Sequence, residues 1–299
     1  MIMHPFLKSS LALVLGLGLA QAADAQQQAQ KVTGKLQFEP GRTIQIKVDQ
    51  TSTMTQDAMG QTIDFKTSGV TIHSYKVTNA TEDNSTLHHS VQRLAFNFEG
   101  MGAKRSFDSD NKKDMSGEFG KPIADMLNKS YDVIIDKSGK TLMARPEKFE
   151  APASDDRSAV ILNQVRDMTD VVNPPARGSN SFFKVLPDKE TGIGDSWRDT
   201  TLTPSESALT VYTLSAITDS TIIVDFKRSA AINMTLQIMG SEALNKQNQV
   251  STGQIILDRA TGLMKEKTIN TDSNGTTEVM GASLPGSGKM TIRMTVEYM

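Results

Sequence analysis

Hydrophobic and polar side chains alternate one by one over most of the chain beyond residue 36. The clearest alternating runs are residues 44–48, 94–98, 232–238 and 290–298. A period of two is typical of β-strands with one buried face and one solvated face. None of these runs is apolar on both faces, which argues against a buried parallel sheet. We therefore expect a mainly β protein with antiparallel strands.

Two stretches predict hairpins of the same kind. Residues 131–142 contain Ile-Ile-Asp-Lys-Ser-Gly, and residues 253–269 contain Ile-Leu-Asp-Arg-Ala-Thr-Gly. The glycine that ends each loop can take the left-handed backbone that closes a hairpin. Upstream of each hairpin the same cues recur in the same order: an early glycine, a strand with a tyrosine, a polar turn and a long alternating strand. This order predicts an internal repeat of two related halves.

Two segments have the periodicity of helices. Residues 121–128 predict a short helix, and residues 155–172 predict a longer one that ends before a pair of prolines. The apolar stripe of the longer helix is Ile161, Val165, Met168 and Val172. This helix is either a connector packed on one sheet or a functional lid.

These patterns divide the chain into segments. We expect a signal peptide at 1–25, a disordered leader at 26–35, a first β half at 36–145, a connector with the helix at 146–180, and a second β half at 181–299. The expected fold is α+β and mainly β: two related antiparallel halves in a curved open sheet or half-barrel, with one longer and one short helix.

The end of the second half contains several polar, glycine-containing stretches. After strands at 221–227 and 231–238, residues 242–249 predict a loop or one helical turn. Residues 272–275 predict a turn, and residues 281–288 predict a flexible loop.

The N-terminus predicts export. A short segment with one lysine precedes an apolar run at 11–20, and Ala23-Asp-Ala25 is a cleavage site of the signal-peptide kind. The run is about half of the roughly 20 residues that a membrane-spanning helix needs. The chain has no cysteine, so no lipid can be attached to one. We expect a periplasmic or secreted protein of a Gram-negative bacterium that is not lipidated and has no transmembrane span after cleavage.

Charge and reactive side chains exclude several functions. The net charge of −2 argues against nucleic-acid binding. His88 and His89 are neighbours and point to opposite faces of a strand, whereas His73 lies across from His89 if residues 79–85 turn. Two histidines without a third ligand fall short of a zinc site. We therefore predict no catalytic residue, no metal and no cofactor.

Apolar side chains supply the remaining candidates. Methionine suits an adaptable apolar cavity, and several methionines occupy predicted inner faces. The candidate ligand-facing residues are Trp197, Phe182, Met234, Leu236, Met290, Ile292 and Met294. The alternative is that the methionines fill a core with few aromatic residues and that Trp197 and Phe182 anchor that core.

One region of the second half resembles a known family. Residues 185–197, with Gly192, Gly194, Asp195 and Trp197, precede the hairpin at 253–262. This arrangement resembles an uncharacterised family of duplicated secreted bacterial β proteins, many of which look like lipoproteins. The present chain departs from them because it has no cysteine to acylate. At the level of fold alone, the pattern is similar to the open half-barrel lipoprotein and lipid carriers of the bacterial envelope.

These observations lead to two functional hypotheses. The first is a non-enzymatic binding or carrier module for an apolar small molecule, a lipid or a lipid-bearing partner. The second is an assembly or structural accessory of the cell envelope that binds proteins through strand edges. An enzyme and an outer-membrane barrel are less favoured, because no catalytic motif is present and aromatic residues make up only 5% of the chain.

Overall fold

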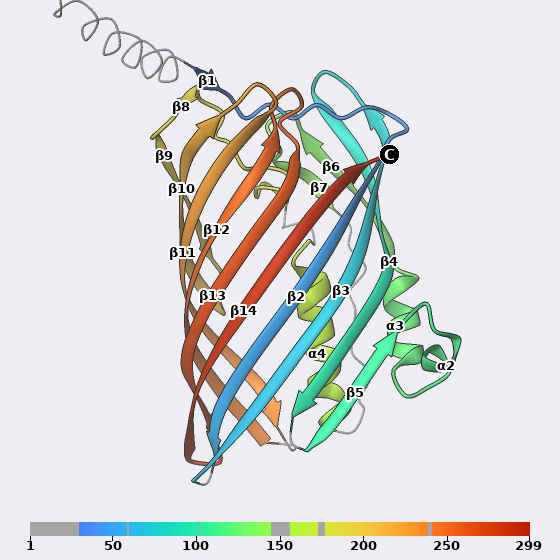
Figure 1. The fold of residues 1–299 in the computed structure, drawn as a ribbon, viewed down its shortest axis with the longest axis vertical. Coiled ribbons are helices and arrows are strands. Elements are labelled where there is room, and N and C mark those ends of the chain that lie inside the picture. Colours follow the sequence, from blue (N-terminus) through green and yellow to red (C-terminus); the bar gives the residue numbers. More distant parts are fainter. Residues whose placement is uncertain (1–29, 59, 101, 145–155, 173–176, 239–240) are drawn as a thin grey trace, which may run out of the picture.

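The computed structural model describes residues 30–58, 60–100, 102–144, 156–172, 177–238 and 241–299. The predicted signal peptide and the prolines of the connector lie outside these residues. A 12-stranded antiparallel sheet makes up most of the described chain, and it curves into a wide open trough (Figure 1). A second, two-stranded sheet pairs β1 (Lys31–Val32) with β8 (Thr191–Gly192).

The strands of the first half lie on one flank of the main sheet. They are β2 (Thr43–Ala58), β3 (Gln61–Ala80), β4 (Asn84–Gly100), β5 (Ala103–Asp108), β6 (Ser130–Asp136) and β7 (Thr141–Ala144). The strands of the second half lie on the other flank. They are β9 (Ser196–Leu202), β10 (Glu206–Ile217), β11 (Thr221–Ile238), β12 (Ser241–Asp258), β13 (Met264–Val279) and β14 (Ala282–Tyr298).

The sheet is open because its two edge strands do not pair. The order is β7-β6-β4-β3-β2-β14-β13-β12-β11-β10-β9, with β5 added beside β4. The halves meet where β14 pairs with β2, in a register that places Tyr298 opposite Ile44 and Gly286 opposite Gln56. Both halves thus belong to one sheet, and the predicted mainly β, antiparallel, open architecture is confirmed.

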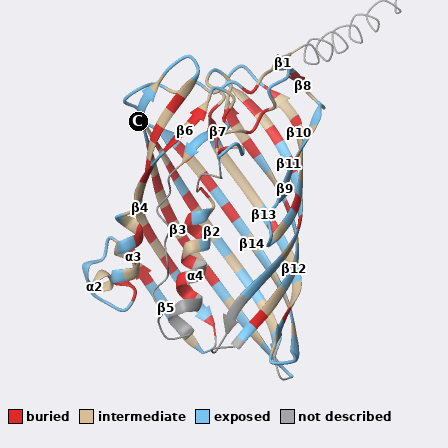
Figure 2. Cartoon of the chain, turned by 180° about the vertical axis from the view of Figure 1, so that it is seen from behind, coloured by how far each residue is buried: buried red, intermediate tan, exposed pale blue. Residues whose placement is uncertain are grey.

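Three helices accompany the sheet within the described residues: α2 (Lys112–Met115), α3 (Gly120–Leu127) and α4 (Asp156–Asp170). Both predicted helices therefore exist. Helix α4 packs on β3 and β4 and lies inside the opening of the trough (Figure 2). Within the described ranges, no helix is long and apolar enough to cross a membrane.

The core follows from the alternation. In β2 the side chains of Ile44, Ile46 and Val48 are buried on the inner face, while Lys47 between them is exposed. The same inward face of β14 buries Met294. The largest hydrophobic cluster joins inner side chains of both halves near the β6–β7 and β12–β13 turns, and Figure 2 shows buried positions concentrated there. A second cluster joins β4 and β5 with α3 and α4 and includes Phe96, Ile123 and Leu162.

An N-terminal strap crosses both hairpin loops at this end. The backbone N–H of Leu36 donates to the carbonyl of Lys137 at 3.0 Å, and that of Gln37 donates to the carbonyl of Thr261 at 2.9 Å. Gly262 has a φ of 71° and lies so close to Lys35 that a Cβ would collide with the backbone. The strap thus ties one hairpin of each half to the other.

The cues of the internal repeat occupy equivalent places in the two halves. The N–H of Gly41 donates to Val77 at 2.8 Å, and the N–H of Gly194 donates to Leu214 at 2.8 Å. Val77 lies two residues after Tyr75, and Leu214 lies two residues after Tyr212. These are the tyrosines of the repeated pattern.

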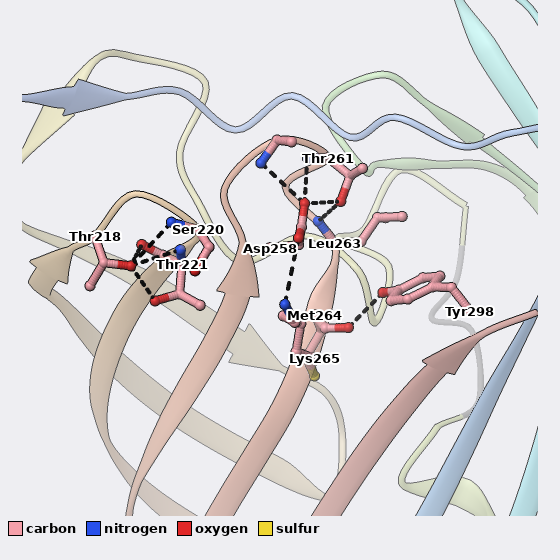
Figure 3. A network of polar contacts seen from close by, with 10 residues as sticks. Thr218, Ser220, Thr221, Asp258, Thr261, Leu263, Met264, Lys265 and Tyr298 are labelled. Carbon is pink, nitrogen blue, oxygen red and sulfur yellow. Dashed lines mark hydrogen bonds and ion pairs between the residues drawn. The ribbon is translucent and has the colours of Figure 1, made fainter.

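The hairpin loops also match. Asp258 accepts hydrogen bonds from the N–H groups of Ala260 and Thr261 at 3.1 and 2.9 Å, and Figure 3 shows its carboxylate inside the loop. Asp136 accepts from Ser138 and Lys140, both at 2.9 Å. An acidic side chain therefore organises the corresponding turn in each half.

Four predictions about the second half are wrong. Residues 242–249 belong to β12, residues 272–275 belong to β13, and most of residues 281–288 belong to β14. The predicted break between 227 and 231 is absent, since β11 is continuous. The inner face of these strands is polar, with buried residues such as Thr271 and Thr277, so their polar composition does not signal a loop. Gly275 is needed in the strand because a Cβ there would collide with the carbonyl of Lys246.

Candidate functional site

The inner face of the first half carries a row of buried aromatic and polar rings. Tyr75 on β3 lies opposite His89 on β4, and His89 lies opposite Tyr131 on β6. Ring centres are 4.6 Å apart for Tyr75 and His89 and 4.5 Å apart for His89 and Tyr131. Strand alternation and the β-bulge between Ile72 and His73 bring these rings to one face.

His73 and His89 are hydrogen-bonded to each other within this row. Nδ1 of His73 lies 3.0 Å from Nε2 of His89, and Nε2 of His73 lies 3.0 Å from the hydroxyl of Thr71. Burial lowers the pKa of His73 to about 4. Burial, followed by the positive potential of His73 and His88, lowers the pKa of His89 to about 3. Both rings are therefore neutral at pH 7, and the predicted proximity of the two histidines is confirmed.

The chain after α4 closes this row. The hydroxyl of Tyr75 donates to the backbone carbonyl of Val172 at 2.7 Å. One helical turn earlier, Met168 packs over Gly69, where any Cβ would collide with the methionine side chain. Tyr75, His73 and His89 are at most 2% exposed. The first row is thus a closed part of the core.

The second half has an equivalent row that remains partly open. Trp197 on β9 lies opposite Tyr212 on β10, and Tyr212 lies opposite Phe226 on β11. The rings of Trp197 and Tyr212 stack with their centres 5.6 Å apart and an interplanar angle of 13°. Trp197 donates its indole N–H to the carbonyl of Val185 at 3.1 Å. Trp197 and Tyr212 are only partly buried.

A lysine completes this second row. Lys267 on β13 lies opposite Met294 and Ile255, which are both buried on the inner face. Its Nζ lies 5.5 Å from the centre of the Phe226 ring. Burial, followed by the positive charge of Arg228, lowers the pKa of Lys267 to about 8. Desolvation therefore disfavours the charged ammonium at this position.

Next to this row, along β11, the inner face carries first a charged pair and then apolar side chains. Arg228 on β11 forms an ion pair with Glu206 on β10. Beyond Arg228, β11 continues on the same face with Ala230, Ile232 and Met234, and the exposed fraction rises from 6% at Ala230 to 38% at Met234. An apolar strip therefore leads from the charged groups toward solvent.

The residues predicted to face a ligand fall into three groups. Trp197, Phe182 and Met290 are partly buried and pack against the main core, and Met234 is exposed on the inner face of β11. Ile292 and Met294 are buried to 3% and 0% and pack the core between the two halves. Leu236 lies on β11 opposite Ala243, but its side chain is outside the described residues.

Sequence reasoning missed Lys267, Arg228 and Glu206. Lys267 is in phase with the inward Ile269 and opposite the inward Ile255, and this phase was the signal that could have identified it. Its neighbours Lys265 and Glu266 are also charged, so composition alone does not distinguish the inward lysine.

The other hollows of the described chain are less suited to an apolar ligand than the second row. Two shallow, open hollows of about 300 and 410 Å³ lie elsewhere on the sheet. The first lies among polar side chains such as Asp49, Asn97 and Arg293, and the second lies along the outer side of β10 and β11. Within the described part of the chain, no group of three or more histidine, aspartate and glutamate residues could hold a metal ion. The open second row is therefore the candidate site.

Comparison with known proteins gives limited information. The model of DUF6263, a family of unknown function, matches residues 177–264, which include strands β8 to β12. No curated protein matches the sequence. Among solved structures, lipovitellin, described for its lipid–protein interactions, aligns with 88% of this chain and 26% of its own at 9% identity and a TM-score of 0.49. This chain thus spans about a quarter of lipovitellin.

Bacterial outer-membrane proteins align less well. The COG4313 outer membrane channel from Pseudomonas putida F1 covers 88% of this chain and 98% of its own at 7% identity, with a TM-score of 0.25. OccK5 (OpdH) of Pseudomonas aeruginosa covers 87% and 98% at 8% identity, with a TM-score of 0.28.

Proposed function

We propose that this protein is an exported, non-enzymatic binding or carrier module that holds an apolar ligand on the inner face of its second half. The observation that carries the proposal is the partly open row of Trp197, Tyr212 and Phe226, which continues along β11 to Met234. Apolar surface that stays open inside a curved sheet is typical of a ligand site. The closed row of the first half has no such surface.

The direct test is to identify what the protein carries. The full chain is expressed with its leader in a Gram-negative host, purified from the periplasm, and examined by native mass spectrometry and lipid extraction. We expect a mature N-terminus after Ala25 and a bound apolar molecule. Retention in the cytoplasm would contradict the export proposal. A protein that carries no ligand and binds no neutral apolar probe would contradict the carrier proposal.

A matched pair of variants locates the site. Met234→Lys places a charge on the inner face of β11, whereas Thr235→Lys places it on the outer face one residue away. Met234→Lys is expected to lower the affinity for a neutral fatty-acid methyl ester several-fold, and Thr235→Lys to leave it unchanged. Equal effects of both variants would place the ligand elsewhere.

A second candidate function is assembly of envelope proteins through a strand edge. Its specific support is β9, an edge strand that pairs with β10 on one side and with no other strand of the described chain on the opposite side. It ends in Leu202, whose side chain is 79% exposed. Such edges can accept a strand from another protein. A photo-crosslinking residue at Leu202 tests this function, with Met280 in the β13–β14 turn as an exposed control. Specific adducts at Leu202 alone would support it, and their absence would remove it.

A further inference from the structure

Lys267 has no acidic partner among the described residues, although its side chain faces the interior. The adjacent Glu266 pairs with Arg293 at 3.1 Å, and the nearby Arg228 pairs with Glu206. The contact of the Lys267 ammonium is the ring of Phe226. A cation–π contact compensates only part of the lost hydration of an enclosed ammonium.

The backbone is adapted to hold Phe226 beneath this lysine. Gly253 on β12 lies between Phe226 and Ile269 in the sheet register. A Cβ at Gly253 would lie 2.8 Å from Cε1 and Cζ of Phe226. The missing side chain therefore lets the ring lie across β12, where Lys267 from β13 reaches over it. The cation is thus positioned by a glycine, an aromatic ring and the strand register together.

We propose that Lys267 binds the acidic head of an amphiphile, a carboxylate or a phosphate, while the apolar chain lies along Ala230, Ile232 and Met234 of β11. An anion supplies the partner that the interior lacks for Lys267. Arg228 adds positive potential beside the head, although Glu206 engages part of its guanidinium. The strand rise of about 3.3 Å per residue gives the apolar stretch from Ala230 to Met234 a length of roughly 13 Å, which suits the part of an acyl chain next to the head.

This inference rests on the proposed carrier function and adds the class of ligand. The acid head distinguishes it from simple apolar binding, because a neutral ligand with the same chain leaves the lysine without a partner. Binding of the acid form should also raise the pKa of Lys267, since a nearby anion favours the charged ammonium.

The experiment compares acid and neutral forms of one chain on the purified mature protein after removal of endogenous lipid. The probes are cis-parinaric acid and its methyl ester, measured by fluorescence titration. Lysophosphatidic acid and a monoacylglycerol compete with the bound probe, and they separate a phosphate head from a carboxylate head. The variants are Lys267→Met, Lys267→Arg and Lys289→Met, the last of which removes an exposed lysine from the outer face of β14.

We expect Lys267→Met to weaken binding of parinaric acid about tenfold or more, since a charged contact is lost, and to leave the ester nearly unchanged. Lys267→Arg should restore acid binding, and Lys289→Met should behave as wild type. If acid and ester bind equally and respond equally to Lys267→Met, the acid-head inference is overturned while the carrier function stands. If wild type binds neither form, both fail.

Discussion

In the first half of the sheet, Tyr75 is followed across the strands by His89 and Tyr131; in the second half, Tyr212 is followed by Phe226 and Gly253. The two rows sit at equivalent positions of the repeat, yet their surroundings differ. The first is covered by the chain around α4, with His73 hydrogen-bonded to His89 and Tyr75 hydrogen-bonded to the backbone of Val172. The second keeps partial exposure and an unpaired cation.

This difference shows how one architecture can supply both stability and a site. In the first half the third position of the row is occupied by the large side chain of Tyr131, and the row is filled. Where Gly253 occupies this position, the ring of Phe226 lies over the glycine and Lys267 can reach the interior. On this comparison the first row stabilises the fold, and the second row is the one that we propose to bind a ligand.

Removing a tyrosine from each row should produce the largest contrast. Tyr75→Ala is expected to lower the free energy of unfolding by about 3–5 kcal/mol, because a buried aromatic side chain and its bond to Val172 are lost. Tyr212→Ala should cost about 1–2 kcal/mol, since this side chain is only partly buried. Urea unfolding followed by circular dichroism measures both. Similar losses would show that the two rows are equally structural.

Acid should destabilise the protein through the two buried histidines of the first row. The pKa of His73 is about 4 and that of His89 about 3 in the folded chain, against an ordinary value of 6.5. As pH falls below 6.5, the unfolded chain binds protons that the folded chain does not. Stability should then fall by about 1.4 kcal/mol per pH unit for each such histidine.

Urea unfolding between pH 7 and pH 4.5 measures this slope. The double variant His73→Gln and His89→Gln should flatten it, whatever its effect on stability at pH 7. His88→Gln is the control, because His88 is exposed and pairs with Asp132 at 2.8 Å on the opposite face. An unchanged slope in the double variant would assign the acid sensitivity to other groups.

Replacing the lysine of the second row should change the free energy of unfolding by a smaller amount, and the change should be stabilising. Lys267→Met is expected to stabilise the unliganded protein by about 1–2 kcal/mol, a value reduced by the partial exposure of the side chain. Lys289→Met should have no effect. Thermal unfolding of delipidated protein measures the difference, and a destabilised Lys267→Met variant would mean that the lysine serves the fold.

The pH dependence of Lys267 has a definite direction. Its pKa is about 8 in the folded chain against 10.5 ordinarily. Below pH 8 both states carry the charge, and the folded state bears the full cost of burying it. Between pH 8 and 10.5 the unfolded chain holds the proton more tightly, so the stability of the wild type should rise relative to Lys267→Met.

The sequence predicted most of the fold where strands cover the core. Runs such as residues 44–48 have one apolar face because their inner side chains meet the opposite flank. The prediction failed at residues 242–249 and 272–275, where the inner face of the strands is also polar. There, pairing with a neighbouring strand determines the structure, and no local pattern reports it.

The site was predictable only in part. Met234 was named as a candidate from its place on a predicted inner face, Trp197 as an aromatic residue beside a turn, and the proximity of His73 and His89 from the turn between their strands. Lys267 was missed because its inward direction depends on partners on β12 and β14. The uncovered state of the second row depends on where α4 packs, which periodicity alone cannot specify.

The pairing of β14 with β2 has a consequence for how the chain reaches this state. The two central strands are separated by nearly the whole sequence, as the pairing of Ile44 with Tyr298 shows. Such distant contacts raise the contact order and slow folding. The two flanks therefore cannot join before β14 has been synthesised, whereas the strands within each flank pair with their neighbours in the sequence and can associate earlier.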